Sequence, residues 1–199
     1  MMNLIVGMNR INESVKRIDN VLYQPELTVE GNEIPTTFEV DYENVSFSYD
    51  GKRNVLSDIQ FHADQGMVCG IVGPSGSGKS TVTKLIGRFW DVDSGEITLG
   101  GVSVKDMPTE ELLGKISVVF QDVYLFHDTI EQNIKMGKED ATREEVIEAA
   151  KKASCHEFIM SLPDGYDTMV GEGGSTLSGG EKQRISIARA LLKDAPIVL

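Results

Sequence analysis

The sequence predicts an α/β protein organised around a phosphate-binding loop. Residues 73–80 read Gly-Pro-Ser-Gly-Ser-Gly-Lys-Ser and fit the pattern G-x-x-x-x-G-K-[ST]. Polar and apolar residues alternate over 38–49, which is the period of a half-buried strand, whereas apolar residues recur at helical spacing over 129–161. These observations predict an antiparallel sheet before the loop and an α-helical part after it.

A strand and a helix are expected on the two sides of the loop. Residues 67–72 form a short apolar run, typical of a buried parallel strand. Residues 80–89 have helical spacing, with Val82, Leu85, Ile86 and Phe89 on the inward face. The loop therefore lies at the end of a strand and the start of a helix, where phosphate-binding loops are found.

The residues of the loop suit a bound polyphosphate. Glycines at 73, 76 and 78 let backbone N–H groups converge on phosphate oxygens, and the helix N-terminus adds a partial positive charge. In this pattern Lys79 reaches the β- and γ-phosphates, and the Ser80 hydroxyl ligates Mg²⁺. The predicted nucleotide-binding residues are Gly73, Pro74, Ser75, Gly76, Ser77, Gly78, Lys79, Ser80 and Thr81.

The composition is that of a globular protein, and 199 residues predict one domain with room for a subdomain. The net charge of −12 repels a phosphate backbone and argues against nucleic acid as a partner. Cys69 and Cys155 form no disulfide framework and are predicted to be buried, reduced thiols. The histidines at 62, 127 and 156 are scattered, so no metal-binding set is predicted.

The first part of the chain predicts a helix and a linker. Residues 1–23 carry apolar side chains at spacings of three and four, which predicts an amphipathic helix with a narrow seam. Residues 24–37 contain two prolines, a glycine and three glutamates and are interpreted as a linker. We expect the helix to be a connector from an upstream domain; packing on its own domain is the alternative.

The middle of the chain predicts short elements that lead to Gln121. They are, in order, strands at 38–49 and 55–63 around a turn at 50–52, a hairpin at 94–104 with Gly100-Gly101 at its turn, a helix at 108–113 and a buried strand at 116–120. Ligands of open α/β sheets bind outside the carboxyl ends of strands, so Gln121 is placed to reach a bound nucleotide. A surface glutamine in a loop is the alternative.

Three helices are expected next, at 129–136, 142–153 and 156–162, and the letters Thr-Arg-Glu-Glu at 142–145 predict a capping box. A loop over 169–176 separates them from a fourth helix.

The fourth helix begins with a specific string. Residues 177–184 read Leu-Ser-Gly-Gly-Glu-Lys-Gln-Arg, and the helix is expected to run to about Leu192. Ser178 is the expected N-cap, and the two glycines after it leave backbone amides accessible. This helix start is therefore a second candidate anion site. A capped helix with a glycine-rich entry is the alternative.

The phosphate-binding loop, Gln121 and residues 177–181, in this order and at these separations, resemble the nucleotide-binding domain of ATP-binding cassette (ABC) transporters over residues 38–199. Tyr49 matches the A-loop aromatic residue, which in the family stacks on adenine. Gln121 matches the Q-loop glutamine, which approaches Mg²⁺ and the attacking water and touches the membrane domain. Ser178, Gly179 and Gly180 match the signature motif, which acts on the γ-phosphate held by the opposing subunit.

Two features resemble exporters in particular. Residues 1–23 look like the end of the last transmembrane helix, and residues 170–173 resemble the exporter X-loop, with Gly173 where the family usually has a basic residue. The resemblance implies an ATP-hydrolysing motor with Lys79 and Gln121 in catalytic roles, ATP and Mg²⁺ as ligands, and Ser80 and Gln121 at the metal. It also implies a helical subdomain at about 122–192.

The implied partners are the membrane-spanning domain of the same transporter and a second nucleotide-binding domain, in a homodimer or a heterodimer, at the cytoplasmic face of the membrane. Residues 196–199 resemble the beginning of the Walker B strand, so the segment is expected to be truncated before the Walker B carboxylates and to bind ATP without hydrolysing it. The alternatives are a soluble ABC-type ATPase without a membrane domain and a non-catalytic nucleotide-binding module.

Overall fold

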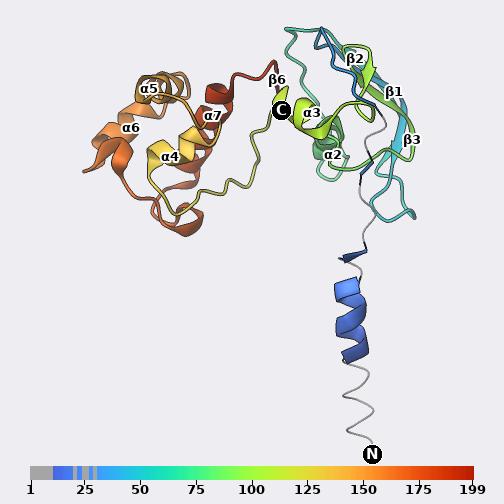
Figure 1. The fold of residues 1–199 in the computed structure, drawn as a ribbon, viewed down its shortest axis with the longest axis horizontal. Helices are drawn as coiled ribbons and strands as arrows, with labels where there is room; N and C mark the ends of the chain where they lie inside the picture. Colours follow the sequence, from blue (N-terminus) through green and yellow to red (C-terminus); the bar gives the residue numbers. More distant parts are fainter. Residues whose placement is uncertain (1–10, 20–21, 24–26, 29–30) are drawn as a thin grey trace, which may run out of the picture.

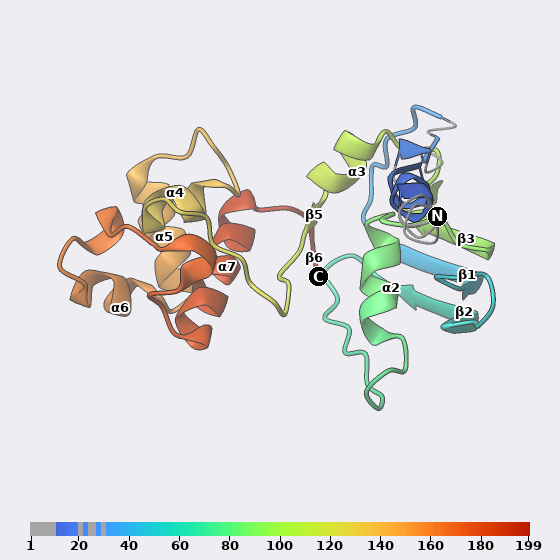
Figure 2. The ribbon, with the colours of Figure 1, turned by 90° about the horizontal axis from the view of Figure 1, so that it is seen from below.

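The computed structural model describes residues 11–19, 22–23, 27–28 and 31–199, and its ribbon shows two lobes (Figure 1). One lobe holds an antiparallel sheet, and the other holds a group of helices. Turned by 90°, the lobes remain side by side, with a short pair of parallel strands between them (Figure 2). The α/β class with an antiparallel β part and an α-helical part is confirmed.

The antiparallel sheet is built around β1 (Val40–Phe47). This strand pairs with β2 (Leu56–Ala63) on one side and β3 (Ser94–Leu99) on the other, and β3 pairs with β4 (Val102–Ser103). Val40 lies opposite Ala63 and also opposite Leu99. Both predicted hairpins are present, and Gly100 and Gly101, at φ of 59° and 74°, make the turn of the second one.

One face of the sheet is covered by the helix that follows the phosphate-binding loop, α2 (Lys79–Ile86). Asn44, at φ of 51°, lies where the pairing of β1 shifts, and this irregularity lets Tyr42 and Val45 both be buried. The Tyr42 hydroxyl donates a hydrogen bond of 2.7 Å to the carbonyl of Val82. Leu85 is completely buried against the sheet, which is worth about 1.5–3 kcal/mol.

The two lobes meet at a parallel pair formed by β5 (Ile116–Ser117) and β6 (Ile197–Val198), and β5 follows α3 (Thr109–Gly114). The Ser117 hydroxyl donates to the carbonyl of Ala190 in the helical lobe at 3.1 Å. The strand predicted at 116–120 is present, but it covers only residues 116–117.

The predicted buried strand at 67–72 is wrong. These residues are irregular, and Val68 and Val72 are 98% and 95% exposed. Cys69 is exposed as well, contrary to expectation, whereas Cys155 is buried as predicted. A parallel strand forms only beside a partner strand. No strand among the described residues pairs with this segment, so its apolar sequence is not enough to make it one.

The helical lobe has its own core. Its elements are α4 (Ile130–Lys135), α5 (Arg143–Lys152), α6 (His156–Ser161), the short turns η1 (Gly165–Asp167) and η2 (Glu172–Gly174), and α7 (Gly179–Lys193). Ile134, Val146, Ile159 and Ile185 are completely buried in this core. The four predicted helices are thus confirmed, including the capping box made by Thr142 and Glu145.

Residues 11–19 are helical, and the apolar residues that the structure describes there, Ile11, Val15 and Ile18, are all exposed. Residues 1–10, 20–21, 24–26 and 29–30 of the predicted connector and linker lie outside the described residues. Within the described part of the chain, no helix has the length and apolar character that crossing a membrane requires.

Candidate nucleotide-binding site

The phosphate-binding loop owes its shape to glycine. Gly76 and Gly78 have φ of 79° and 88°, a left-handed conformation that side chains with a Cβ rarely adopt. A Cβ at Gly78 would lie 2.7 Å from the Leu56 side chain, and one at Gly73 would lie 2.7 Å from the Ser77 hydroxyl. The loop therefore closes tightly against β2 and leads directly into α2, with Gly78 as the N-cap.

The start of α2 is electropositive. Its first turn contains no acidic residue, so the partial positive charge of the helix N-terminus is not neutralised there. The Lys79 ammonium group donates hydrogen bonds to the carbonyls of Gly73 at 3.0 Å and Pro74 at 2.8 Å. Lys79 thus folds back over its own loop. Both contacts are on the surface, where a phosphate oxygen can replace a carbonyl at small cost.

Lys79, Ser80 and Gln121 line one large cavity, of about 1000 Å³. Its remaining walls come from the first strand pair, from residues 64–71, from residues further along α2 with Phe89 after it, and from residues 118–122 and 196–199. Gln121 lies at the end of the irregular segment that follows β5, and it lines this cavity.

The loop that carries Gln121 is held by a buried asparagine in α4. The Asn133 side chain donates to the carbonyl of Phe126 at 3.0 Å and accepts from the Phe126 N–H at 2.9 Å. Arg189 of α7 donates to the Asn133 carbonyl at 2.8 Å. Sequence reasoning missed both residues. The available signal was a polar residue, Asn133, between two apolar core residues of a short helix.

Tyr49 lies beside the beginning of α2. Its hydroxyl is 3.1 Å from the Thr81 hydroxyl, in a hydrogen bond for which either group can be the donor. Its ring makes edge contacts with Phe47 and Trp90, at centroid distances of 4.8 and 5.1 Å. About half of the Tyr49 surface is exposed, at 49%, so the residue is available for stacking.

The signature residues lie in the other lobe. Ser178 is the N-cap of α7, and its hydroxyl accepts from the Glu181 N–H at 3.4 Å. The Glu181 carboxylate accepts from the Ser178 N–H at 2.7 Å. Hydrogen bonding to this carboxylate, first from the Ser178 backbone and then from its side chain, holds the pKa of Glu181 below its ordinary value. Residues 178–180 are not among those that line the large cavity. A single chain therefore does not bring the signature helix to its own phosphate-binding loop (Figures 1 and 2).

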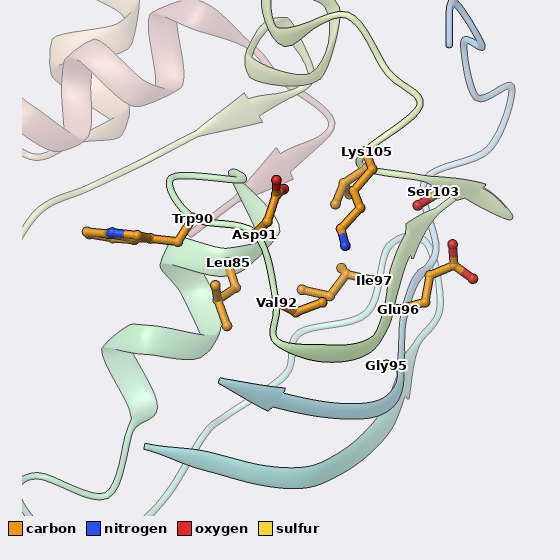
Figure 3. A pocket seen from close by; sticks show the side chains of 10 residues that line it. Leu85, Trp90, Asp91, Val92, Gly95, Glu96, Ile97, Ser103 and Lys105 are labelled. Carbon is orange, nitrogen blue, oxygen red and sulfur yellow. The ribbon is translucent and has the colours of Figure 1, made fainter. Parts of the chain in front are cut away.

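A smaller cavity, of about 280 Å³, is lined by Leu85 of α2, Val92 of the loop that follows it and Ile97 of β3, among other residues (Figure 3). It contains none of the predicted site residues. Beside it, the buried Arg88 guanidinium bonds the Asp91 carboxylate at 2.8 Å and donates to the carbonyls of Lys105 and Thr28 at 3.0 and 2.6 Å. Arg88 thus ties the described part of the linker to the loop that follows α2.

The sequence of this chain is similar to those of known transporter proteins. The family model described as ABC transporter matches residues 56–199. The ATP-dependent lipid A-core flippase of Legionella pneumophila is 48% identical over 161 residues, which are 81% of this chain and 27% of the flippase. A Bacillus subtilis protein, whose name proposes a multidrug export ATP-binding/permease protein, is 50% identical over 161 residues, 80% of this chain and 28% of that protein.

Among solved structures, a bacterial Atm1-family ABC exporter with ATP bound matches with a TM-score of 0.86 and 40% sequence identity, over 96% of this chain and 34% of the exporter chain. The chain belongs to the ABC transporter family. It corresponds to the nucleotide-binding domain and spans about 28% of the length of the curated relatives. The ABC-type fold predicted from the sequence is confirmed, and so is the resemblance to exporters.

Proposed function

We propose that this chain is the ATP-binding motor domain of an ABC exporter. The observation that supports this most directly is that Lys79 and Ser80, at the start of α2, line one cavity together with Gln121, while Tyr49 lies beside Thr81. In this proposal the loop amides and Lys79 hold the phosphates of ATP. Tyr49 stacks on the base.

Lys79 changes partners when nucleotide binds. Its ammonium group leaves the carbonyls of Gly73 and Pro74 for the β- and γ-phosphates, because a charge-assisted bond to phosphate is stronger than one to a neutral carbonyl. Gln121, which lines the same cavity as Lys79, orients the attacking water. Phosphoryl transfer needs such positioning and charge neutralisation more than covalent chemistry.

The donor set also suits Mg²⁺, a hard cation that prefers oxygen ligands. Ser80 and Gln121 line the same cavity, and the hydroxyl of one and the amide oxygen of the other can both coordinate Mg²⁺. We assign the metal to these two residues together with the phosphates. When bound, Mg²⁺ neutralises charge that develops on the phosphate oxygens.

A second nucleotide-binding domain completes each site. Ser178, Gly179 and Gly180 begin α7 at the far lobe, so they act on a nucleotide only when they face the phosphate-binding loop of another subunit. Two sites then form at a head-to-tail interface, in a homodimer or a heterodimer. A single chain binds ATP without hydrolysing it.

The remaining partner is the membrane-spanning domain, which places this domain at the cytoplasmic face of the membrane. The proposed organisation is a connector helix at 1–23, a linker at 24–37 and the nucleotide-binding domain at 38–199, with the helical subdomain at about 122–192. The exposed apolar residues at 11, 15 and 18 and the exporter names of the relatives support this proposal. Closure on ATP and opening after hydrolysis drive the membrane domain.

The test is ATP binding to the 199-residue chain, measured by calorimetry with and without Mg²⁺. Lys79→Ala should weaken binding about tenfold or more, because it removes a charged donor to phosphate. Ser80→Ala should abolish the gain in affinity that Mg²⁺ provides. Lys151→Ala, which removes an exposed lysine from α5, is the matched control and should bind as the parent does. Equal binding by the parent and Lys79→Ala would refute the proposed site.

A further inference from the structure

Trp90 is the only tryptophan of the chain, and its ring is part of an aromatic group beside the phosphate-binding loop. It meets Tyr49 at 5.1 Å between ring centroids with an interplanar angle of 87°. Phe47 meets Tyr49 at 4.8 Å and 83°. Both are edge contacts, the arrangement that the charge distribution of aromatic rings favours. Two perpendicular rings therefore hold Tyr49.

Trp90 is itself fixed relative to α2. The Lys84 ammonium group lies 5.9 Å from the centre of the Trp90 ring, within the range of a cation–π contact, and Lys84 is on α2. Trp90 is 41% exposed, so it stays accessible beside Tyr49. In Figure 3 the Trp90 side chain extends away from the other labelled residues, so filling the small cavity does not account for its position.

The rest of the Tyr49 environment leaves its orientation incompletely determined. One hydrogen bond to Thr81 holds the hydroxyl, and Phe47 holds one part of the ring. Phe47 is buried, at 2% exposure, so it is a rigid support. Trp90 supplies the second contact on the ring. Without the Trp90 ring, the Tyr49 ring could rotate while its hydroxyl keeps the hydrogen bond to Thr81.

We propose that Trp90 is a positioning residue for the base of the bound nucleotide. It holds the Tyr49 ring in the orientation in which the exposed part of that ring stacks on the base. This inference rests on the proposed function, since it presupposes that a nucleotide occupies the phosphate-binding loop. In this role Trp90 does not contact the phosphates. Mutation of Trp90 should therefore affect only ligands that have a base, whereas mutation of Lys79 should affect every ligand that has phosphates.

The experiment compares two ligands by calorimetry on the full chain: ATP, which has a base, and inorganic tripolyphosphate, which has none. Trp90→Ala should bind ATP about threefold to tenfold more weakly, the range expected for loss of one aromatic contact. Its affinity for tripolyphosphate should stay within about twofold of the parent. Trp90→Phe should recover most of the ATP affinity, because it restores a ring that can meet Tyr49.

A double-mutant cycle with Tyr49→Ala identifies the route of the effect. If Trp90 acts through Tyr49, the double variant should bind ATP as weakly as Tyr49→Ala alone. The fluorescence of Trp90 gives a spectroscopic readout, since no other residue contributes tryptophan emission. ATP should change this emission, tripolyphosphate should not, and Tyr49→Ala should remove the change.

Three results would overturn the inference: an equal loss for both ligands in Trp90→Ala, unchanged ATP affinity, or additive effects in the double variant. Circular dichroism verifies folding, and Trp90→Leu, which keeps apolar volume without a ring, replaces the alanine variant if that one does not fold. ATP affinity of the parent level in Trp90→Leu would also refute the role. If the proposed function itself is wrong, Lys79→Ala will bind both ATP and tripolyphosphate with the affinity of the parent, and this result distinguishes the two failures.

Discussion

At the scale of single residues, two glycines with a left-handed backbone differ in their surroundings. Gly78 has a φ of 88°, and a Cβ added there would lie 2.7 Å from the Leu56 side chain and 3.1 Å from the carbonyl oxygen of Val55. Gly51 has a similar φ of 67°, yet a Cβ there would meet nothing within 4 Å. The two positions therefore separate the cost of the left-handed backbone from the cost of a steric clash.

We expect Gly51→Ala to lower the free energy of unfolding by about 1 kcal/mol, the cost of a left-handed conformation for a residue with a Cβ. Gly78→Ala should cost at least about 2 kcal/mol, because the clash with β2 adds to it. Urea denaturation measures both. Equal losses in the two variants would show that the packing of the loop against Leu56 is unimportant.

At the scale of elements, α7 begins with two reciprocal hydrogen bonds between Ser178 and Glu181. The backbone N–H and the side chain of Ser178 lower the pKa of Glu181 from its ordinary value of 4.5. A carboxyl group whose pKa is lower in the folded state stabilises that state above its unfolded pKa. This contribution is fully present above about pH 4.5 and is lost as the pH falls through the folded pKa.

Glu181→Gln should therefore be less stable than the parent at pH 7, by about 0.5–1 kcal/mol, which is the scale of a helix cap. The difference should shrink as the pH is lowered to about 3, because the parent then also lacks the carboxylate. Urea titrations at a series of pH values measure it. A difference that is independent of pH would mean that the ionised carboxylate contributes nothing to the cap.

At the scale of the whole molecule, the two lobes have separate cores. Leu85 belongs to the core beneath the sheet, and Ile159 belongs to the core of the helical lobe; both are completely buried. The lobes meet through short elements, including the parallel pair β5 and β6. Each core is thus expected to respond to its own mutations.

Leu85→Ala and Ile159→Ala should each cost about 2–5 kcal/mol, as cavities in buried cores do. Their effects should add to within about 0.5 kcal/mol in the double variant, because the two sites share no partner. Hydrogen exchange should accelerate mainly in the lobe that carries the mutation. Strong non-additivity, or exchange that accelerates equally in both lobes, would show that the cores are coupled.

Local patterns in the sequence were sufficient to predict most of the helices and strands. The capping box at 142–145, the Ser178 N-cap and the Gly-Gly hairpin turn are confirmed, because each depends on residues within a few positions of one another. The predicted strand at 67–72 fails for the opposite reason. A parallel strand depends on a partner distant in sequence, and the described chain supplies none.

The sequence by itself therefore determined the chemistry available at the site: loop amides, Lys79, Ser80, Gln121 and Tyr49. Tertiary structure alone decided that three of these side chains share a cavity and that Ser178 lies in the other lobe. It also revealed the supports made by Asn133, Arg88 and Trp90. Such supports join segments far apart in the chain, and no local spacing encodes their contacts.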